Sequence, residues 1–255
     1  MPAIRAFLFN VAFFGLTAVL ALAYLPLLVL PWRVLSGGVR LWAVIVVWLL
    51  RVIIGLRHEV RGADNLPHRP VIVAAKHQST WETITLNMLL RDPAAVIKKE
   101  LTLIPVWGWL ARRTRHIRVD RRAGVKALRE MTAAAAMAVA DGRSIVIFPQ
   151  GTRIAPGDWR PYLPGVAALY GALGLPVVPV ALNSGLFWGR RSFVKRPGVI
   201  TVEFLAPIAP GLDRKAFMRE LEHRIETATR RLEEEAVARF QISLPSAGSQ
   251  ASQTG

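Results

Sequence analysis

The stretch AAKHQSTWET, residues 74–83, places His77 and Glu82 five positions apart, with Ser79 between them. A carboxylate that accepts a hydrogen bond from Nδ1 of a histidine leaves Nε2 free to take a proton from an attacking hydroxyl. Such a general base contributes ~10² to 10⁴ in rate. The same residues also fit a capping box, in which Ser79 begins a helix and Glu82 reaches back to its backbone N–H. Spacing alone leaves both interpretations open.

A second polar stretch, FPQGTR at residues 148–153, ends in an arginine that follows a short apolar run and a glycine. The guanidinium of Arg153 is suited to bind a phosphate through two parallel hydrogen bonds, although it is also one surface arginine among many. Gly151 permits close approach of the backbone to a substrate, or only a turn. The chain has no cysteine, and its five histidines lack metal-ligand spacing, so we expect no disulfide, no cysteine nucleophile and no metal.

The charge and the hydrophobicity of the chain narrow the class of partner. Lys and Arg number 33 against 17 Asp and Glu, a formal charge of +16, and 53% of the residues are hydrophobic. A basic chain attracts any polyanion, but one this apolar favours anionic membrane lipids. No motif that reads nucleic-acid bases is present. We therefore expect a lipid surface, and no nucleic acid, as the partner.

The N-terminal part, residues 1–57, is expected to anchor the protein in a membrane through hydrophobic helices. Residues 6–32 carry no charge, and as one helix they would reach ~40 Å, enough to span a bilayer or to dip in and return. A second apolar piece, residues 41–56, follows a Ser-Gly-Gly break and contains Arg51, which favours an in-plane or re-entrant element. A cleaved signal peptide is the alternative, but this apolar run exceeds the ~7 to 15 residues typical of one. Since most Lys and Arg come later, we place the remaining domain on the cytoplasmic side of the inner membrane.

Residues 58–244 show the pattern of an α/β domain. Runs rich in β-branched residues predict buried strands at 71–75, 94–98, 116–120, 144–149, 177–182 and 199–204. Helical patterns lie between several of them, and one ends at Asp141-Gly142. We therefore expect a mixed, largely parallel sheet covered by helices, with an amphipathic helix from Leu212 and a disordered tail at 245–255. In this fold His77 lies just past a strand end, where α/β proteins often carry chemistry.

Five blocks in a fixed order resemble a known family. They are the histidine block, KKELTLIPVWGWL from Lys98, RHIRVDRR from Arg115, IFPQGTR from Ile147 and VVPVALNSG from Val177. Over roughly residues 58–208 the set is similar to the glycerophospholipid acyltransferases, specifically the 1-acylglycerol-3-phosphate acyltransferases, whose hallmarks are N-H-x-S-x-x-D and F-P-E-G-T-R. Three positions depart from that pattern: Lys76 replaces Asn, Glu82 replaces Asp and Gln150 replaces Glu. Glu82 keeps a carboxylate, whereas the neutral Gln150 is expected to alter the charge of the headgroup pocket.

The resemblance implies transfer of a fatty acyl group from acyl-CoA or acyl-carrier protein to the free hydroxyl of 1-acylglycerol-3-phosphate, giving phosphatidic acid. In that reaction His77 is the general base, Glu82 orients it, and N–H donors stabilise the oxyanion, with no cofactor besides the acyl donor. Ser79 as an acyl nucleophile is the lesser route. The matched blocks imply substrate binding by Lys98, Arg121, Gly151, Thr152 and Arg153.

Two other functions stay open at this point. One is an acyltransferase for a different lysolipid acceptor, such as lyso-ornithine lipid, which has no phosphate. The other is a non-catalytic, basic membrane-surface protein in which the histidine block only caps a helix.

Overall fold

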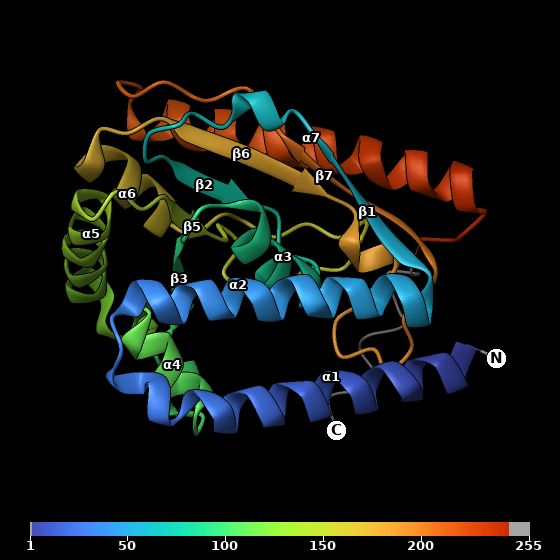
Figure 1. The fold of residues 1–255 in the computed structure, drawn as a ribbon. Helices are drawn as coiled ribbons and strands as arrows, with labels where there is room; N and C mark the ends of the chain where they lie inside the picture. Colours follow the sequence, from blue (N-terminus) through green and yellow to red (C-terminus); the bar gives the residue numbers. More distant parts are fainter. Residues whose placement is uncertain (1, 245–255) are drawn as a thin grey trace.

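A seven-stranded sheet forms the centre of the computed structural model, which describes residues 2–244 (Figure 1). Its order is β1-β7-β6-β2-β5-β3-β4, and all neighbours are parallel except β6 and β7. The strands are β1 (Leu56–Arg61), β2 (Ile72–Ala75), β3 (Ala94–Lys98), β4 (Ile117–Val119), β5 (Ile145–Ile147), β6 (Val177–Leu182) and β7 (Gly198–Phe204). The predicted mixed, largely parallel sheet is confirmed. The tail expected at 245–255 lies outside the described residues.

All six predicted strands are present as β2 to β7, but β1 was missed. Its sequence, LRHEVR, is mostly polar, and only Leu56 is buried. Since β1 is an edge strand that pairs with β7 alone, it needs little apolar surface. The sheet therefore begins at Leu56, slightly before residue 58, at which we expected the domain to start.

Helices cover both faces of the sheet. They are α1 (Pro2–Tyr24), α2 (Trp32–Leu49), α3 (Trp81–Leu89), α4 (Trp107–Arg113), α5 (Gly124–Ala140), α6 (Gly165–Leu173) and α7 (Arg214–Phe240). Successive residues of a strand face opposite sides, so β2 contributes to two cores. Val73 and Ala75 pack with residues of α2 and α3, whereas Ile72 and Ala74 pack with residues of α5, α6 and α7.

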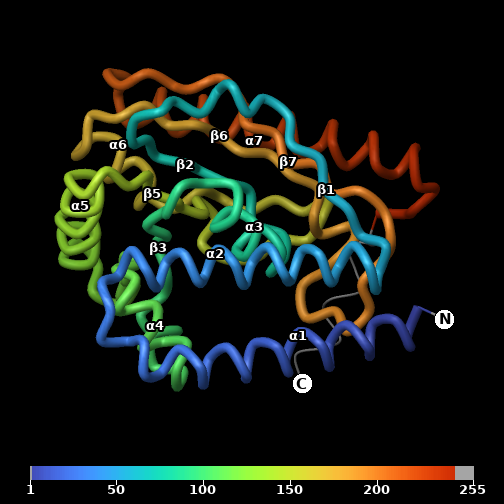
Figure 2. The backbone as a smooth tube through the Cα atoms, in the orientation of Figure 1, coloured from blue at the N-terminus to red at the C-terminus, as the bar shows by residue number. Residues whose placement is uncertain are grey.

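The charge-free N-terminal run is not one long helix, because it contains the first helix and the turn of a helical hairpin. Helix α1 ends at Tyr24, a 3₁₀ turn follows at Pro26–Val29, and α2 begins after Pro31, so the chain turns back (Figure 2). Proline disrupts a helix because it has no N–H and restricts the residue before it. By length and composition, residues 2–24 and 32–54 are each suited to cross a membrane.

The expected break at Ser-Gly-Gly, residues 36–38, was wrong because α2 runs through it. A Cβ at Gly38 would lie 1.3 Å from Tyr24 Oη. Gly38 therefore allows α2 to approach the end of α1 closely, rather than marking the end of a helix.

Candidate active site

The carboxyl edge of the sheet brings the histidine block and the FPQGTR block together. Strands β2 and β5 are parallel neighbours, so the loops that follow them leave the same edge. The ring of His77 stacks on Phe148, with centroids 4.2 Å apart. The backbone N–H of Ile154 donates to the carbonyl of His77 at 2.8 Å. Two segments about 70 residues apart thus form one surface around the His77 ring.

The predicted pair of His77 and Glu82 is assembled in the structure. Nδ1 of His77 lies 2.8 Å from Oε1 of Glu82. The Glu82 side chain is 1% exposed and that of His77 is 15% exposed, so the ring can reach a substrate while its carboxylate partner is shielded. Because the carboxylate accepts, the hydrogen-bond network assigns the proton to Nδ1 and leaves the lone pair on Nε2. This is the tautomer that a general base requires.

Glu82 also closes the turn that precedes α3. Its Oε1 accepts from the backbone N–H groups of Gln78 at 2.7 Å and Ser79 at 2.6 Å, and its Oε2 accepts from Ser184 Oγ at 2.7 Å. Ser79 Oγ in turn accepts from the N–H of Trp81, the first residue of α3, at 3.2 Å. The capping contact and the histidine contact therefore coexist, because one carboxylate makes both.

Arg153 lies beside this pair with most of its hydrogen-bonding capacity unused. One of its guanidinium nitrogens donates to Thr80 Oγ1 at 2.8 Å, its one hydrogen bond among residues 2–244. The pKa of Arg153 is lowered, chiefly by burial, although the nearby Glu82 acts in the opposite direction. A guanidinium has five N–H donors, so an anion would find a partly desolvated binding group here.

Arg121 and Gly151 lie against each other. Gly151 has a φ of +67°, which suits glycine, and a Cβ at this position would come within 2.9 Å of an Arg121 guanidinium nitrogen. Burial also lowers the pKa of Arg121. Thr152 joins Gly151 to Arg153 in the same turn, so four of the five residues implied for substrate binding gather here.

The fifth residue, Lys98, is placed differently. It ends β3 with an exposed side chain, and no hydrogen bond or ion pair among residues 2–244 joins it to His77. No group of three metal-ligating side chains occurs among residues 2–244.

Two of the three residues that depart from the family motifs, Lys76 and Gln150, meet at one carboxylate of α7. Lys76 Nζ donates to both oxygens of Glu226, at 2.9 and 2.7 Å, and Gln150 Nε2 is 3.5 Å from Oε1 of the same residue. Tyr162 Oη donates to that oxygen at 2.8 Å. Gln150 is 2% exposed, and its side chain lies against α7.

Sequence reasoning missed several residues that shape the site. Three of them, Thr80, Phe148 and Ser184, lie inside the five motif blocks of the sequence. Membership in those blocks could therefore have indicated them. Glu226 has no such signal, since it is one of many acidic residues on an amphipathic helix.

A family model and the relatives found by sequence comparison agree that the chain is similar to acyltransferases. An acyltransferase family model matches residues 57–183. The 1-acyl-sn-glycerol-3-phosphate acyltransferase of Pseudomonas aeruginosa is 38% identical over 164 residues, which are 64% of this chain and 64% of that protein. The enzyme of the same name from Limnanthes douglasii is 30% identical over 202 residues, 76% of this chain and 71% of that protein.

The fold also matches a solved structure, that of the 1-acyl-sn-glycerophosphate (LPA) acyltransferase from Thermotoga maritima. The TM-score is 0.72 at 23% identity, over 92% of this chain and 97% of the other. The solved structure shows the shared fold, and the sequence matches show that the chain belongs to the glycerophospholipid acyltransferase family.

Proposed function

We propose that the protein transfers a fatty acyl group from acyl-CoA or acyl-carrier protein to the free hydroxyl of 1-acylglycerol-3-phosphate, giving phosphatidic acid. The observation that carries the proposal is the His77 ring, held through Nδ1 by the buried Glu82 and flanked by Arg153. Two relatives are named for the acceptor, which supports the same choice for this chain.

The chemistry follows from these groups. Nε2 of His77 takes the proton of the acceptor hydroxyl while the hydroxyl oxygen attacks the carbonyl carbon of the thioester. The tetrahedral oxyanion then collapses and expels the thiolate, which receives the proton from His77. Glu82 holds the ring in the correct tautomer and stabilises the imidazolium while it exists. Since a thioester is already activated, neither a metal nor a further cofactor is needed.

Direct attack by the acceptor is favoured over an acyl-serine intermediate. Ser79 is fully buried, and its hydroxyl oxygen already accepts from the first residue of α3. A serine nucleophile would have to leave that contact and reach the substrate.

The phosphate of the acceptor would bind at the turn from Gly151 to Arg153. Arg153 has free donors for a bidentate contact, and Arg121 adds a second cation against Gly151. Arg190 and Arg191 add positive charge near Arg153. A doubly charged phosphomonoester matches this concentration of cations.

The helical hairpin would hold this site at the cytoplasmic face of the inner membrane. Large apolar side chains are exposed along α1, including Phe7, Phe14, Val19 and Leu22, each at least 58% exposed. Many large apolar side chains exposed on one helix support contact with lipid. The protein should therefore stay with membranes at high salt and leave only with detergent, and release by salt alone would contradict the anchor.

A panel of acceptors tests the reaction. The purified full-length protein would be assayed with 1-acylglycerol-3-phosphate, another lysophospholipid and lyso-ornithine lipid, each with acyl-CoA and with acyl-carrier protein. We expect the highest kcat/KM with 1-acylglycerol-3-phosphate. Preference for lyso-ornithine lipid would replace the acceptor, and absence of transfer to any acceptor would favour the non-catalytic membrane protein.

A further inference from the structure

Helix α7 reaches the two residues that flank His77. Glu226 and Glu233 are seven residues apart, so they project from the same face of the helix. Glu226 binds Lys76, the residue before His77, and Glu233 Oε1 accepts from Gln78 Nε2, the residue after it, at 2.5 Å. The histidine thus lies between two side chains that the same helix holds.

The contact on the Gln78 side forms a closed set of hydrogen bonds. Gln78 Oε1 accepts from the N–H of Gly185 at 3.0 Å, and Glu233 Oε2 accepts from the N–H of Gly157 at 3.1 Å. Gln78 is 0% exposed and Glu233 is 4% exposed. An unpaired polar atom in such a place is costly, so the set constrains the loop strongly.

The contact on the Lys76 side is an ion pair in which the lysine is almost fully buried. The Lys76 side chain is 1% exposed, and its single ammonium faces the single carboxylate of Glu226. A glutamate in place of Gln150 would put a second carboxylate about where Nε2 now lies, 3.5 Å from Glu226. Two of the three departures from the family motifs, Lys76 and Gln150, therefore lie against the same carboxylate, that of Glu226.

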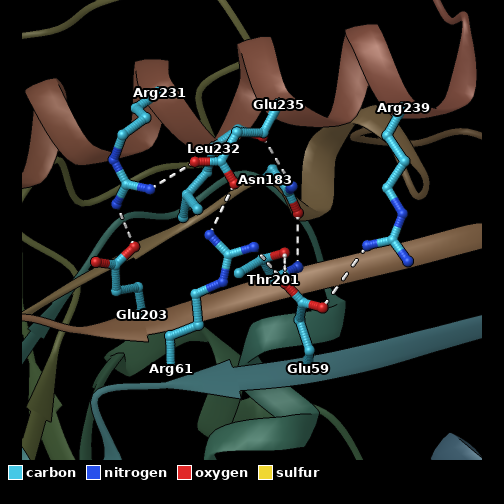
Figure 3. A network of polar contacts seen from close by, with 9 residues as sticks. All are labelled: Glu59, Arg61, Asn183, Thr201, Glu203, Arg231, Leu232, Glu235 and Arg239. Atoms are coloured by element: carbon cyan, nitrogen blue, oxygen red, sulfur yellow. Dashed lines mark hydrogen bonds and ion pairs between the residues drawn. The ribbon is translucent and has the colours of Figure 1, made fainter.

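Helix α7 is itself firmly attached to the sheet (Figure 3). Arg61 of β1 bridges Glu59 and Glu235, and Arg231 pairs with Glu203 of β7. Asn183, just past β6, donates to the carbonyl of Leu232 at 3.1 Å and accepts from the N–H of Thr201 at 2.9 Å. Because these contacts tie α7 to three strands, the helix is a rigid support for the His77 loop.

We propose that Glu226 and Glu233 are positioning residues, which fix the His77 ring for proton transfer by holding Lys76 and Gln78 on either side of it. The proposal rests on the proposed function, in which His77 is the base. Each glutamate acts through a neighbour of His77, Glu226 through Lys76 and Glu233 through Gln78. Misplacement of a reacting group by ~1 Å lowers a rate by ~10²-fold, so a loosened loop should slow the chemical step rather than weaken substrate binding.

The main test is Glu233→Gln, with Glu234→Gln as the matched control on the exposed face of the same helix. In Glu233→Gln the new NH₂ group must face a donor, either Gln78 Nε2 or the Gly157 N–H, so one hydrogen bond is lost. We expect kcat to fall ~10- to 100-fold, with the KM values for both substrates within about twofold of wild type. The control should leave kcat unchanged.

A swapped pair provides the rescue. In Gln78→Glu combined with Glu233→Gln, the carboxylate at 78 accepts from Gly185 and from the new amide at 233, whose oxygen accepts from Gly157. Every hydrogen bond and the net charge are restored, so kcat should recover most of its loss. An unchanged kcat in Glu233→Gln with a lowered melting temperature would show that the contacts are only structural and would overturn the proposal.

A readout independent of turnover separates this proposal from the proposed function. The ¹⁵N chemical shifts of the His77 ring, assigned with His77→Gln, should change in Glu233→Gln and stay the same in Glu234→Gln. If the wild-type protein transfers no acyl group, the proposed function fails, whereas these shifts still decide whether α7 positions the ring. Identical shifts in all three proteins would refute the positioning role.

Discussion

Two regions at opposite edges of the sheet use the same residue types in different ways. At the carboxyl edge, His77 and Arg153 follow β2 and β5. At the amino edge, His116 and Arg143 precede β4 and β5. His116 Nδ1 accepts from the N–H of Ala95 at 3.1 Å, and Arg143 donates to the carbonyls of Asp92, Arg115 and Pro93 at 3.1 to 3.2 Å.

The difference lies in how much hydrogen-bonding capacity is left for a ligand. Arg143 is 2% exposed, with partners in the protein on all three of its nitrogens, and its guanidinium lies over the Trp32 ring. Arg153, in contrast, has one partner, and Nε2 of His77 has none among the described residues. The residues equipped for chemistry are therefore distinguished by their unused donors and acceptors, not by their type.

Loss of the base should give the largest effect. His77→Ala should lower kcat by ~10² to 10⁴, while the fold persists because a ring at a strand end contributes little to the core. The control, His116→Ala, removes the acceptor of a backbone N–H and should lower stability by about 1 to 3 kcal/mol with kcat retained. Steady-state kinetics and thermal melting of both variants check this contrast. Retained turnover in His77→Ala would remove the functional difference between the two edges.

The amino edge should show its own response to pH. Burial, with help from Arg143, lowers the pKa of His116 to about 4, whereas an unfolded histidine has a pKa of about 6.5. Between these values the unfolded chain binds a proton that the folded protein excludes, so stability falls as the pH falls through 6.5 toward 4. The contribution from His116 between pH 7 and pH 5 is roughly 2 kcal/mol. Denaturant unfolding should show a smaller loss over this range in His116→Gln, and an equal loss would argue against the buried neutral ring.

The carboxylate at the carboxyl edge should combine both kinds of effect. Glu82→Ala leaves the N–H groups of Gln78 and Ser79 without their acceptor, and His77 without its orienting partner. We therefore expect kcat to fall by at least about tenfold, and the melting temperature to fall as well. Glu82→Asp keeps a carboxylate and should retain activity. Full turnover in Glu82→Ala with only a lowered melting temperature would reduce this residue to a helix cap.

Much of this arrangement could be predicted from local sequence. All six runs rich in β-branched residues form strands, and in the central strands β2 and β6 every side chain is buried because both faces of the sheet are covered. The contact between His77 and Glu82 is short in sequence, so their spacing was sufficient to suggest it. Strand β1 was not predicted because this edge strand carries mostly polar side chains. The predicted helix break at Gly38 was wrong because this glycine makes room for Tyr24.

The parts that could not be predicted depend on contacts distant in sequence. Lys76 and Glu226 are separated by 150 residues, and their pairing depends on where α7 lies on the sheet. The burial of Gln150 is a consequence of the same placement. A pattern of apolar residues tells which face of a helix is inward, but not which strand-end loop that face will meet.

The smallest expected effect concerns the two arginines, and it tests the acceptor as well as the site. Arg153→Lys keeps a positive charge but loses the planar fork that binds a phosphate through two hydrogen bonds. With 1-acylglycerol-3-phosphate, KM for the acceptor should rise by roughly three- to tenfold, while KM for the acyl donor changes less. A lysolipid without phosphate offers no anion of the same geometry, so its use should suffer less.

Arg143→Lys is the control: it should lower the melting temperature and leave both KM values near those of wild type, because Arg143 binds the protein's own carbonyls. If Arg153→Lys impaired both acceptors equally, Arg153 would be a structural residue like Arg143, and the contrast between the two edges of the sheet would then depend on the histidines alone.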